Sequence, residues 1–214
     1  MFVQQNIKLN TDVFFYNNSY NVNLTTVSSF LAYTKQTDFI DLTGCDALTD
    51  LSFCYAYSDI LVDPINIPSR HFELKLPTSP LMDVTGLFEG VNFIRQGNEN
   101  IDISGIFNGY KINNARSCFK NTYCNCTGSP FDNEYIDSVQ NISSMFGIGK
   151  SELVNDKGTI SNFEWITSNM IASSRTVSGP TNGNVVESVG VFEGKNIENL
   201  VDFDFRTSSN IAHN

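Results

Sequence analysis

Residues 143–151 read SSMFGIGKS and end in Gly149, Lys150 and Ser151, the residue types that close a phosphate-binding P-loop. Such a loop also needs a glycine five residues before Gly149, a buried strand before the loop and a helix after it. Position 144 is Ser, and Gly158 interrupts the segment downstream. We therefore interpret this stretch as part of an internal repeat, and we expect no nucleotide or other cofactor.

Cysteine ligands are the second chemistry that the residue types offer. Cys118, Cys124 and Cys126 could supply three ligands to zinc, but a structural zinc site takes four ligands, usually from paired short hairpins. Neither histidine, His71 or His213, lies near them in the sequence. The odd number of cysteines, five, also argues against a disulfide framework. We expect buried reduced thiols and no metal.

Acidic side chains are the third candidate, because paired carboxylates perform acid–base chemistry on glycans. Asp202 and Asp204 alternate along an expected strand and so share a face, and Asp132, Glu134 and Asp137 gather in a loop-like stretch. No HExxH, GxSxG or calcium-loop pattern surrounds any of them. Solvent-facing carboxylates are the commoner case, so we expect no catalytic residues and keep a glycan depolymerase as an alternative.

The composition favours β structure and excludes several classes of partner. Charged residues make up only 17% of the chain, so Asn, Ser, Thr and Gly must cover much of the surface. Aromatic residues make up 12%, which is enough to build a core, and we expect the single tryptophan, Trp165, to pack there rather than stack on a sugar. The net charge of −10 opposes binding to nucleic acid, and no apolar run approaches the ~20 residues of a membrane helix. We expect neither nucleic-acid binding nor membrane insertion.

One short pattern recurs through the chain and explains the P-loop-like stretch. It occurs in LTDLSFCYAY (48–57), LMDVTGLFEG (81–90), IDISGIFNG (101–109), NNARSCFKN (113–121) and VQNISSMF (139–146). Each copy has Asp or Asn five residues before an aromatic residue, apolar residues four and one before it, and Ser, Thr or, once, Arg three before it. A late echo, VGVFEG (189–194), keeps only the end of the pattern. The expected structural core of the repeats consists of Tyr55, Phe88, Phe107, Phe119, Phe146 and Phe192.

The pattern predicts how each copy folds. The Asp or Asn side chain accepts a hydrogen bond from a backbone N–H further on, and the apolar positions share one face of a short helical turn. Alternating segments, DFIDLTG (38–44), HFELKLP (71–77) and LVDFDF (200–205), predict short strands beside several copies. Because one copy cannot bury its own apolar face, neighbouring copies must stack. The expected fold class is a β-rich repeat protein, an irregular leucine-rich-repeat-like solenoid with a short strand and a short helical turn per repeat.

These motifs resemble the BspA-like leucine-rich repeat family, in particular the repeat described as the "Mycoplasma lipoprotein" type. LTDLSFCYAY, MDVTGLFEG and VQNISSMF are similar to the second half of its unit, and IDLTGC (40–45) and NLVDFDFRTSSNIAH (199–213) are similar to the first half. The spacing between copies is irregular, so inserted loops or lost repeats are expected. The resemblance implies a non-enzymatic adhesin or interaction module, as found in bacteria, protists and large viruses, with no catalytic residues.

Two regions are expected along the chain. Residues 1–35 predict an N-terminal cap or attachment hairpin, with VFFY and YNVNLTTV as its strands, and residues 36–214 predict the degenerate solenoid. The last repeat has its strand but lacks the later aromatic position of the pattern, so we expect either a longer chain beyond residue 214 or a partner that completes the strand.

The biological setting is expected to be a virus particle. The N-terminal stretch does not have the pattern of a signal peptide, so we expect an adhesive protein that is assembled in the host cytoplasm and leaves with the virion. A phage fibre, tail or head decoration fits this description. The expected partners are other virion proteins, a host surface receptor or glycan, and further copies of the chain as a homo-oligomer. The alternative is a bacterial or protist BspA-like adhesin at the cell surface.

Overall fold

Short strands and tight turns build the described part of the chain, and its helix is limited to short 3-10 turns such as η2 (Ile136–Ser138). The computed structural model describes residues 15–16, 19–20, 22–36, 39–62, 74–95, 101–147, 158–161, 165–166 and 196–197. Within these ranges, no helix is long and apolar enough to cross a membrane. The expectation of a β-rich protein is confirmed. The strands are β1 (Phe15–Tyr16), β2 (Ser19–Tyr20), β3 (Lys35–Gln36), β4 (Asp59–Val62), β5 (Leu81–Asp83), β6 (Asn92–Arg95), β7 (Ile101–Asp102), β8 (Lys111–Asn114), β9 (Cys124–Asn125), β10 (Thr159–Ile160) and β11 (Asn196–Ile197).

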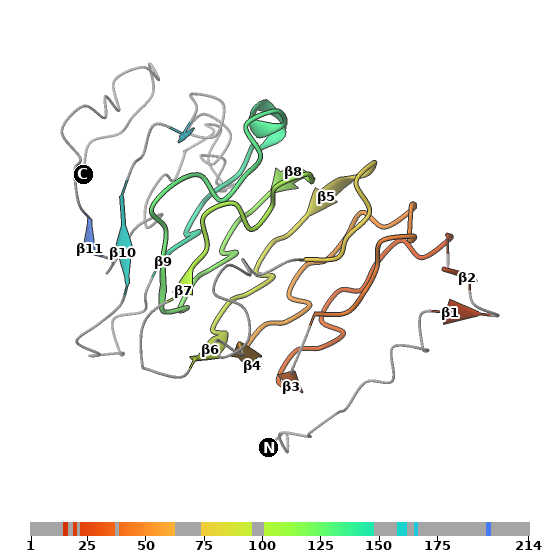
Figure 1. Cartoon of the computed structure of the whole chain (residues 1–214), viewed down its shortest axis with the longest axis horizontal. Coiled ribbons are helices and arrows are strands. Elements are labelled where there is room, and N and C mark those ends of the chain that lie inside the picture. The colour runs from red at the N-terminus through yellow and green to blue at the C-terminus, as the bar shows by residue number, and fades with distance from the viewer. Residues whose placement is uncertain are drawn as a thin grey trace, which may run out of the picture.

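The strands form small open sheets, and most of the pairings are parallel. Strands β3, β4 and β6 make a three-stranded parallel sheet, and the pairs β5–β8, β7–β9 and β10–β11 are also parallel. Strands β1 and β2 pair antiparallel, as in the expected hairpin, but β2 ends at Tyr20, and Val22 and Asn23, within the expected second strand, form a turn. Because parallel neighbours need a long crossover, segments far apart in the sequence lie side by side. Figure 1 shows β3, β4 and β6 along one edge of the molecule and β5 and β8 along the opposite edge.

Four of the five repeated segments lie next to one another in register, together with one further segment, residues 26–33, and we call each of these five a rung. The rungs are residues 26–33, 50–57, 83–90, 114–121 and 141–147. At each of the four junctions, four alternate N–H groups of one rung donate to four alternate carbonyl groups of the next, with N···O distances of 2.7–3.0 Å. Parallel bridges join the first residues of the rungs along the same order, and the bridge between Asp83 and Asn114 belongs to the β5–β8 pair. The same backbone pattern therefore repeats from rung to rung.

The expected short helical turn is wrong for these rungs. Each rung contains consecutive three-residue-spaced hydrogen bonds, such as Cys54 N–H to Leu51 and Ala56 N–H to Phe53, which define tight turns. The residues two before and, in four rungs, two after the aromatic position have φ of 54–65°, as in type II turns. A helix would use every N–H within the segment. In the rungs, alternate N–H groups bond the neighbouring rung instead, so tertiary pairing decided the backbone conformation.

The aromatic positions of the rungs form a buried stack. The ring centroids of Tyr55 and Phe88, of Phe88 and Phe119, and of Phe119 and Phe146 are 5.5–5.8 Å apart, with interplanar angles of 8–16°. All four side chains are buried, and Leu31 takes the equivalent position of the first rung. Stacked aromatic pairs add ~0.5–1.5 kcal/mol each to the effect of burial. One position of the repeat thus supplies a continuous line of buried aromatic rings to the core.

Phe107 lies in a different set of segments from the other aromatic residues. Its ring stacks on Phe131 at 5.8 Å and contacts Phe119 at a tilt, at 6.1 Å. Residues 101–107 pair with 124–131 through β7, β9 and a Phe107–Phe131 bridge. Phe107 is fully buried, but it does not continue the stack of the rungs. The sequence pattern did not separate the two sets because Phe107 follows the same consensus.

The first rung lies within residues 1–35, the region expected to be a separate cap. Thr26 forms a parallel bridge with Asp50, and residues 27–33 make the full set of junction bonds to the second rung. Residues 26–33 therefore pair as a rung, and the boundary at residue 36 stays a prediction. Leu replaces the aromatic residue and Thr replaces Asp in this copy, TVSSFLAY, and these replacements hid it.

Candidate functional site

The first side chain of each rung is committed to the backbone. The Oδ1 atoms of Asp50, Asp83, Asn114 and Asn141 accept hydrogen bonds from the N–H two residues further on, at 2.8–3.2 Å, and Thr26 Oγ1 does the same at 3.1 Å. The turn-forming role predicted for the Asp and Asn residues is confirmed. These carboxylates hold turns in place, which argues against their use as acid–base groups.

Asp102 shows how strongly such a carboxylate is held. Its Oδ1 accepts from both the N–H and the hydroxyl of Ser104, at 3.0 and 2.6 Å, and its Oδ2 accepts from the Thr127 hydroxyl. Burial by itself raises the pKa of Asp102, but the hydrogen bonds from Ser104 and Thr127 outweigh it and hold the pKa below its ordinary value. The group is therefore ionised near neutral pH and acts as a hydrogen-bond acceptor.

The acidic stretch at 132–137 is also structural at its first residue. Asp132 accepts hydrogen bonds from the N–H of Gly109, at 2.7 Å, and from the N–H of Glu134, at 2.8 Å. Glu134 is exposed, and so is Asp137, which lies in η2. Within the described ranges, no group of three His, Cys, Asp or Glu side chains could hold a metal ion.

The cysteines are buried thiols, as expected. Cys45, Cys54, Cys118, Cys124 and Cys126 are all buried. Burial raises the pKa of Cys54 to about 12 and raises the pKa of Cys118 well above its ordinary value. Such thiols are poor nucleophiles, because the thiolate is the reactive form.

Trp165 packs in the core, which confirms that prediction. Its ring is 6% exposed and meets Phe131 and Phe146 edge to face, at 5.8 and 6.4 Å. Other candidates lie outside the described residues: Gly149, Lys150, Ser151, His71, His213, Asp202, Asp204 and Phe192.

Three exposed aromatic side chains, Tyr33, Phe53 and Tyr57, form what we call the aromatic platform. Their exposed fractions are 53%, 37% and 41%. The rings of Tyr33 and Tyr57 stack with centroids 5.2 Å apart and an interplanar angle of 12°. All three residues have φ of 56–60°, a conformation that costs a non-glycine residue about 1–2 kcal/mol. Aromatic residues at such positions are unusual, and strained residues of this kind concentrate at functional sites.

The rings of Phe53 and Tyr57 pack against two glycines of the third rung. A Cβ on Gly86 would lie 2.3 Å from the ring of Phe53, and a Cβ on Gly90 would lie 2.4 Å from the ring of Tyr57. Each ring therefore lies against the bare backbone of the neighbouring rung. The Tyr57 hydroxyl also donates to Glu89 Oε1 at 2.8 Å, so the ring is held at both ends. Lys120 Nζ lies 3.6 Å from Glu89 Oε1, the oxygen that accepts the Tyr57 hydrogen bond.

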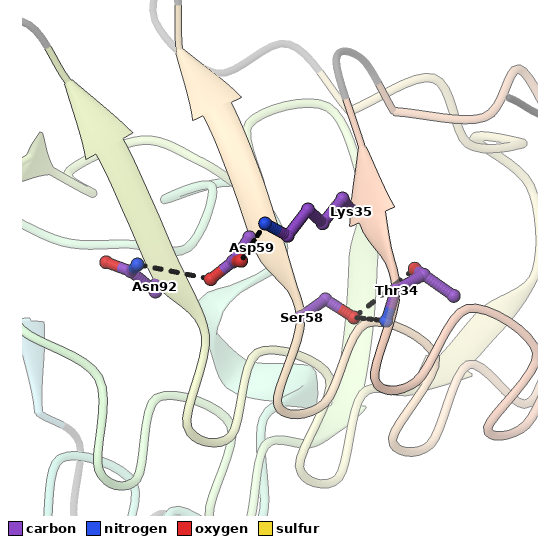
Figure 2. Close-up of polar contacts among 5 residues, drawn as sticks. All are labelled: Thr34, Lys35, Ser58, Asp59 and Asn92. Atoms are coloured by element: carbon purple, nitrogen blue, oxygen red, sulfur yellow. Dashed lines mark hydrogen bonds and ion pairs between the residues drawn. The ribbon is translucent and has the colours of Figure 1, made fainter. Parts of the chain in front are cut away.

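A row of polar side chains, Lys35, Asp59 and Asn92, crosses the sheet two residues beyond Tyr33, Tyr57 and Gly90. We call it the polar row, and Figure 2 shows it running across β3, β4 and β6. Lys35 Nζ lies 3.6 Å from Asp59 Oδ2, and Asn92 Nδ2 donates to Asp59 Oδ1 at 3.1 Å.

The residues just before the polar row support it from inside the molecule. The N–H of Thr34 donates to Ser58 Oγ at 3.0 Å, and both hydroxyls donate to the carbonyl of Leu31 at 2.6 Å (Figure 2 draws the Thr34–Ser58 contacts). Both side chains are buried. The polar row therefore projects from a backbone whose inner face is fixed by hydrogen bonds.

The aromatic platform and the polar row were not among the residues expected to act. Their members occupy variable positions of the repeat, so the consensus gave them no weight. A signal was present in the sequence: Tyr33 and Tyr57 stand where Gly90 and Gly109 stand in other copies, and an aromatic residue at a glycine position is unusual.

Comparison of the chain with models of protein families, with curated proteins and with solved structures finds no match. The function must therefore be argued from the geometry of the molecule.

Proposed function

We propose that this chain is a solenoid of leucine-rich-repeat-like coils, related in its repeat to the BspA-like family, that serves as a non-enzymatic structural or adhesive protein. In this proposal the rungs form one side of the coils, and the segments that pair around Phe107 and Phe131 belong to the other side. Between successive rungs the chain passes through the segments that contain Asp41, Lys75, Phe107 and Phe131. Asp41 bridges Lys75 as Phe107 bridges Phe131, which is the order that stacked coils require.

The observation that carries the proposal is the register of the five rungs. Four backbone hydrogen bonds recur at every junction, and the same side-chain position supplies Tyr55, Phe88, Phe119 and Phe146 to one aromatic stack. A scaffold of this kind presents its variable side chains in rows on a long surface, which suits binding to large partners. The carboxylates of the rungs accept hydrogen bonds that hold the turns, and this structural role favours binding over catalysis as the function of the chain.

We place the protein in a virus particle, as part of a fibre, tail or head decoration. The low charged content and the acidic balance favour this role, since they suit a surface covered by small polar residues. The alternative is a BspA-like adhesin at a bacterial or protist cell surface.

Fractionation of the native source tests these two settings. A virion component co-sediments with purified particles at a constant ratio to the other particle proteins, whereas an adhesin is recovered with the cell envelope. Recovery only as free protein in the soluble fraction would contradict both. Incubation with candidate polysaccharides tests the second alternative, a depolymerase, because release of reducing ends would show that the protein is an enzyme.

A further inference from the structure

We propose that the aromatic platform and the polar row together form a binding site for a neutral glycan. This inference rests on the proposed adhesive function and names the ligand class for it. It commits to uncharged hexose polymers.

The shape and chemistry of the aromatic platform fit a sugar ring. One face of a pyranose carries mainly C–H groups, and such a face packs on an aromatic ring while the hydroxyls around its edge seek hydrogen bonds. Tyr33, Phe53 and Tyr57 offer partly exposed rings, and the rings of Phe53 and Tyr57 lie against Gly86 and Gly90. Because the backbone and the Tyr57–Glu89 hydrogen bond already fix Tyr57, ligand binding would order few side chains.

The polar row supplies the other half of the recognition. Lys35 and Asn92 carry donors, and Asp59 carries acceptors, within one short row beside the platform. A hydroxyl is both a donor and an acceptor, so a mixed row of this kind suits a sugar edge. Lys35 and Asp59 also cancel each other's charge, which leaves the row without a preference for ions.

The net negative charge of the chain selects against anionic glycans. The net charge of −10 repels polymers rich in uronic acids, sulfate or sialic acid, and these lose affinity further because the polar row offers no excess of positive charge. Exposed aromatic clusters also mark surfaces that bind proteins. The balanced polar row beside the strained, glycine-backed rings favours the glycan, and a protein partner is one outcome of the test.

The residue types at the platform positions are a second reason to assign a role to them, since the described residues at these positions have positive φ in every rung but only the platform residues are aromatic. Asn121 occupies the position of Tyr33 and Tyr57 in the fourth rung, and Gly90 occupies it in the third, so the fold accepts small residues there. The aromatic rings are therefore not required by the backbone, which indicates a use at the surface.

The test measures binding of the full chain to soluble neutral glucans, galactans and mannans and to polygalacturonate, by isothermal titration calorimetry and by retardation in glycan-containing native gels. We expect at least one neutral polymer to bind and polygalacturonate not to bind. Tyr33→Ala should weaken binding about tenfold, through loss of the outermost ring, while Tyr33→Phe retains it. Lys35→Ala should weaken it about threefold to tenfold.

A matched control is available in the same rung. Phe30 is an aromatic residue of the first rung and is 43% exposed. The equivalent position is buried in the other four rungs, where it holds Cys54, Leu87, Cys118 and Met145. This position therefore does not lie on the side of the rungs that carries the aromatic platform. Phe30→Ala should leave glycan binding unchanged. Thermal unfolding of every variant shows whether a loss of binding reflects a loss of folding.

Three results would overturn the inference: no binding to any neutral polymer, equal binding by the Tyr33→Ala variant, or preference for polygalacturonate. Retention of a particle or envelope protein that depends on Tyr33, without glycan binding, would also overturn it while leaving the proposed adhesive function intact. Release of reducing ends from a bound glycan would refute the non-enzymatic function and leave the binding site in place, so the two proposals fail separately.

Discussion

Replacement of Gly90 by alanine tests how the rungs and the aromatic platform depend on each other. Gly90 and Gly109 both have positive φ, 65° and 81°, so alanine at either position should destabilise the protein by about 1 kcal/mol through the backbone alone. A Cβ on Gly109 would meet nothing within 4 Å, whereas a Cβ on Gly90 would lie 2.4 Å from the Tyr57 ring. Displacing that ring breaks its stack with Tyr33 and its hydrogen bond to Glu89. We expect Gly90→Ala to cost about 1–3 kcal/mol more than Gly109→Ala.

The measurement is the free energy of unfolding in urea for the wild type, both glycine variants, Tyr57→Ala and the double variant Tyr57→Ala/Gly90→Ala. Because the ring is already absent in the double variant, Gly90→Ala should there cost no more than Gly109→Ala. The coupling energy between positions 57 and 90 is then about 1–3 kcal/mol. Equal costs for the two single glycine variants, within about 0.5 kcal/mol, would refute the seating of Tyr57 on Gly90.

Three further outcomes are expected. Phe119→Ala removes a fully buried ring from the middle of the aromatic stack and should lower the free energy of unfolding by about 3–5 kcal/mol. Phe119→Leu should lower it by less than half of that. A urea titration that shows almost no change in the free energy of unfolding for Phe119→Ala would contradict the stack. The lowered pKa of Asp102 contributes stability above its ordinary pKa of 3.8, and this stability is lost as the pH falls through the lower pKa of the folded state. In thermal melts between about pH 7 and about pH 2, Asp102→Asn should therefore lose less stability on acidification than the wild type. The same pH profile for the variant and the wild type would count against the hydrogen bonds from Ser104 and Thr127. The buried thiols, including Cys54 with its pKa of about 12, should react with a thiol reagent only after denaturant is added, and rapid stoichiometric labelling of the native protein would contradict their burial.

Much of the local chemistry was readable in the sequence. The Asp or Asn at the start of each copy forms the predicted turn, the apolar and aromatic positions are buried wherever they are described, and Trp165 packs in the core. These outcomes depend on residue type and short spacing, which a sequence states directly. The β-rich class followed from the same signals together with a composition low in charge.

The sequence by itself thus determined which residues turn and which are buried, whereas the tertiary structure decided which segments are neighbours and how the backbone runs through them. Phe107 has the same consensus as Phe119, but it stacks on Phe131, and the first rung pairs with the others although it has Leu31 in the aromatic position. The turns replace a helix because alternate N–H groups bond the next rung. Tyr33, Tyr57 and Gly90 come together only through that long-range parallel pairing, whose register no local pattern specifies.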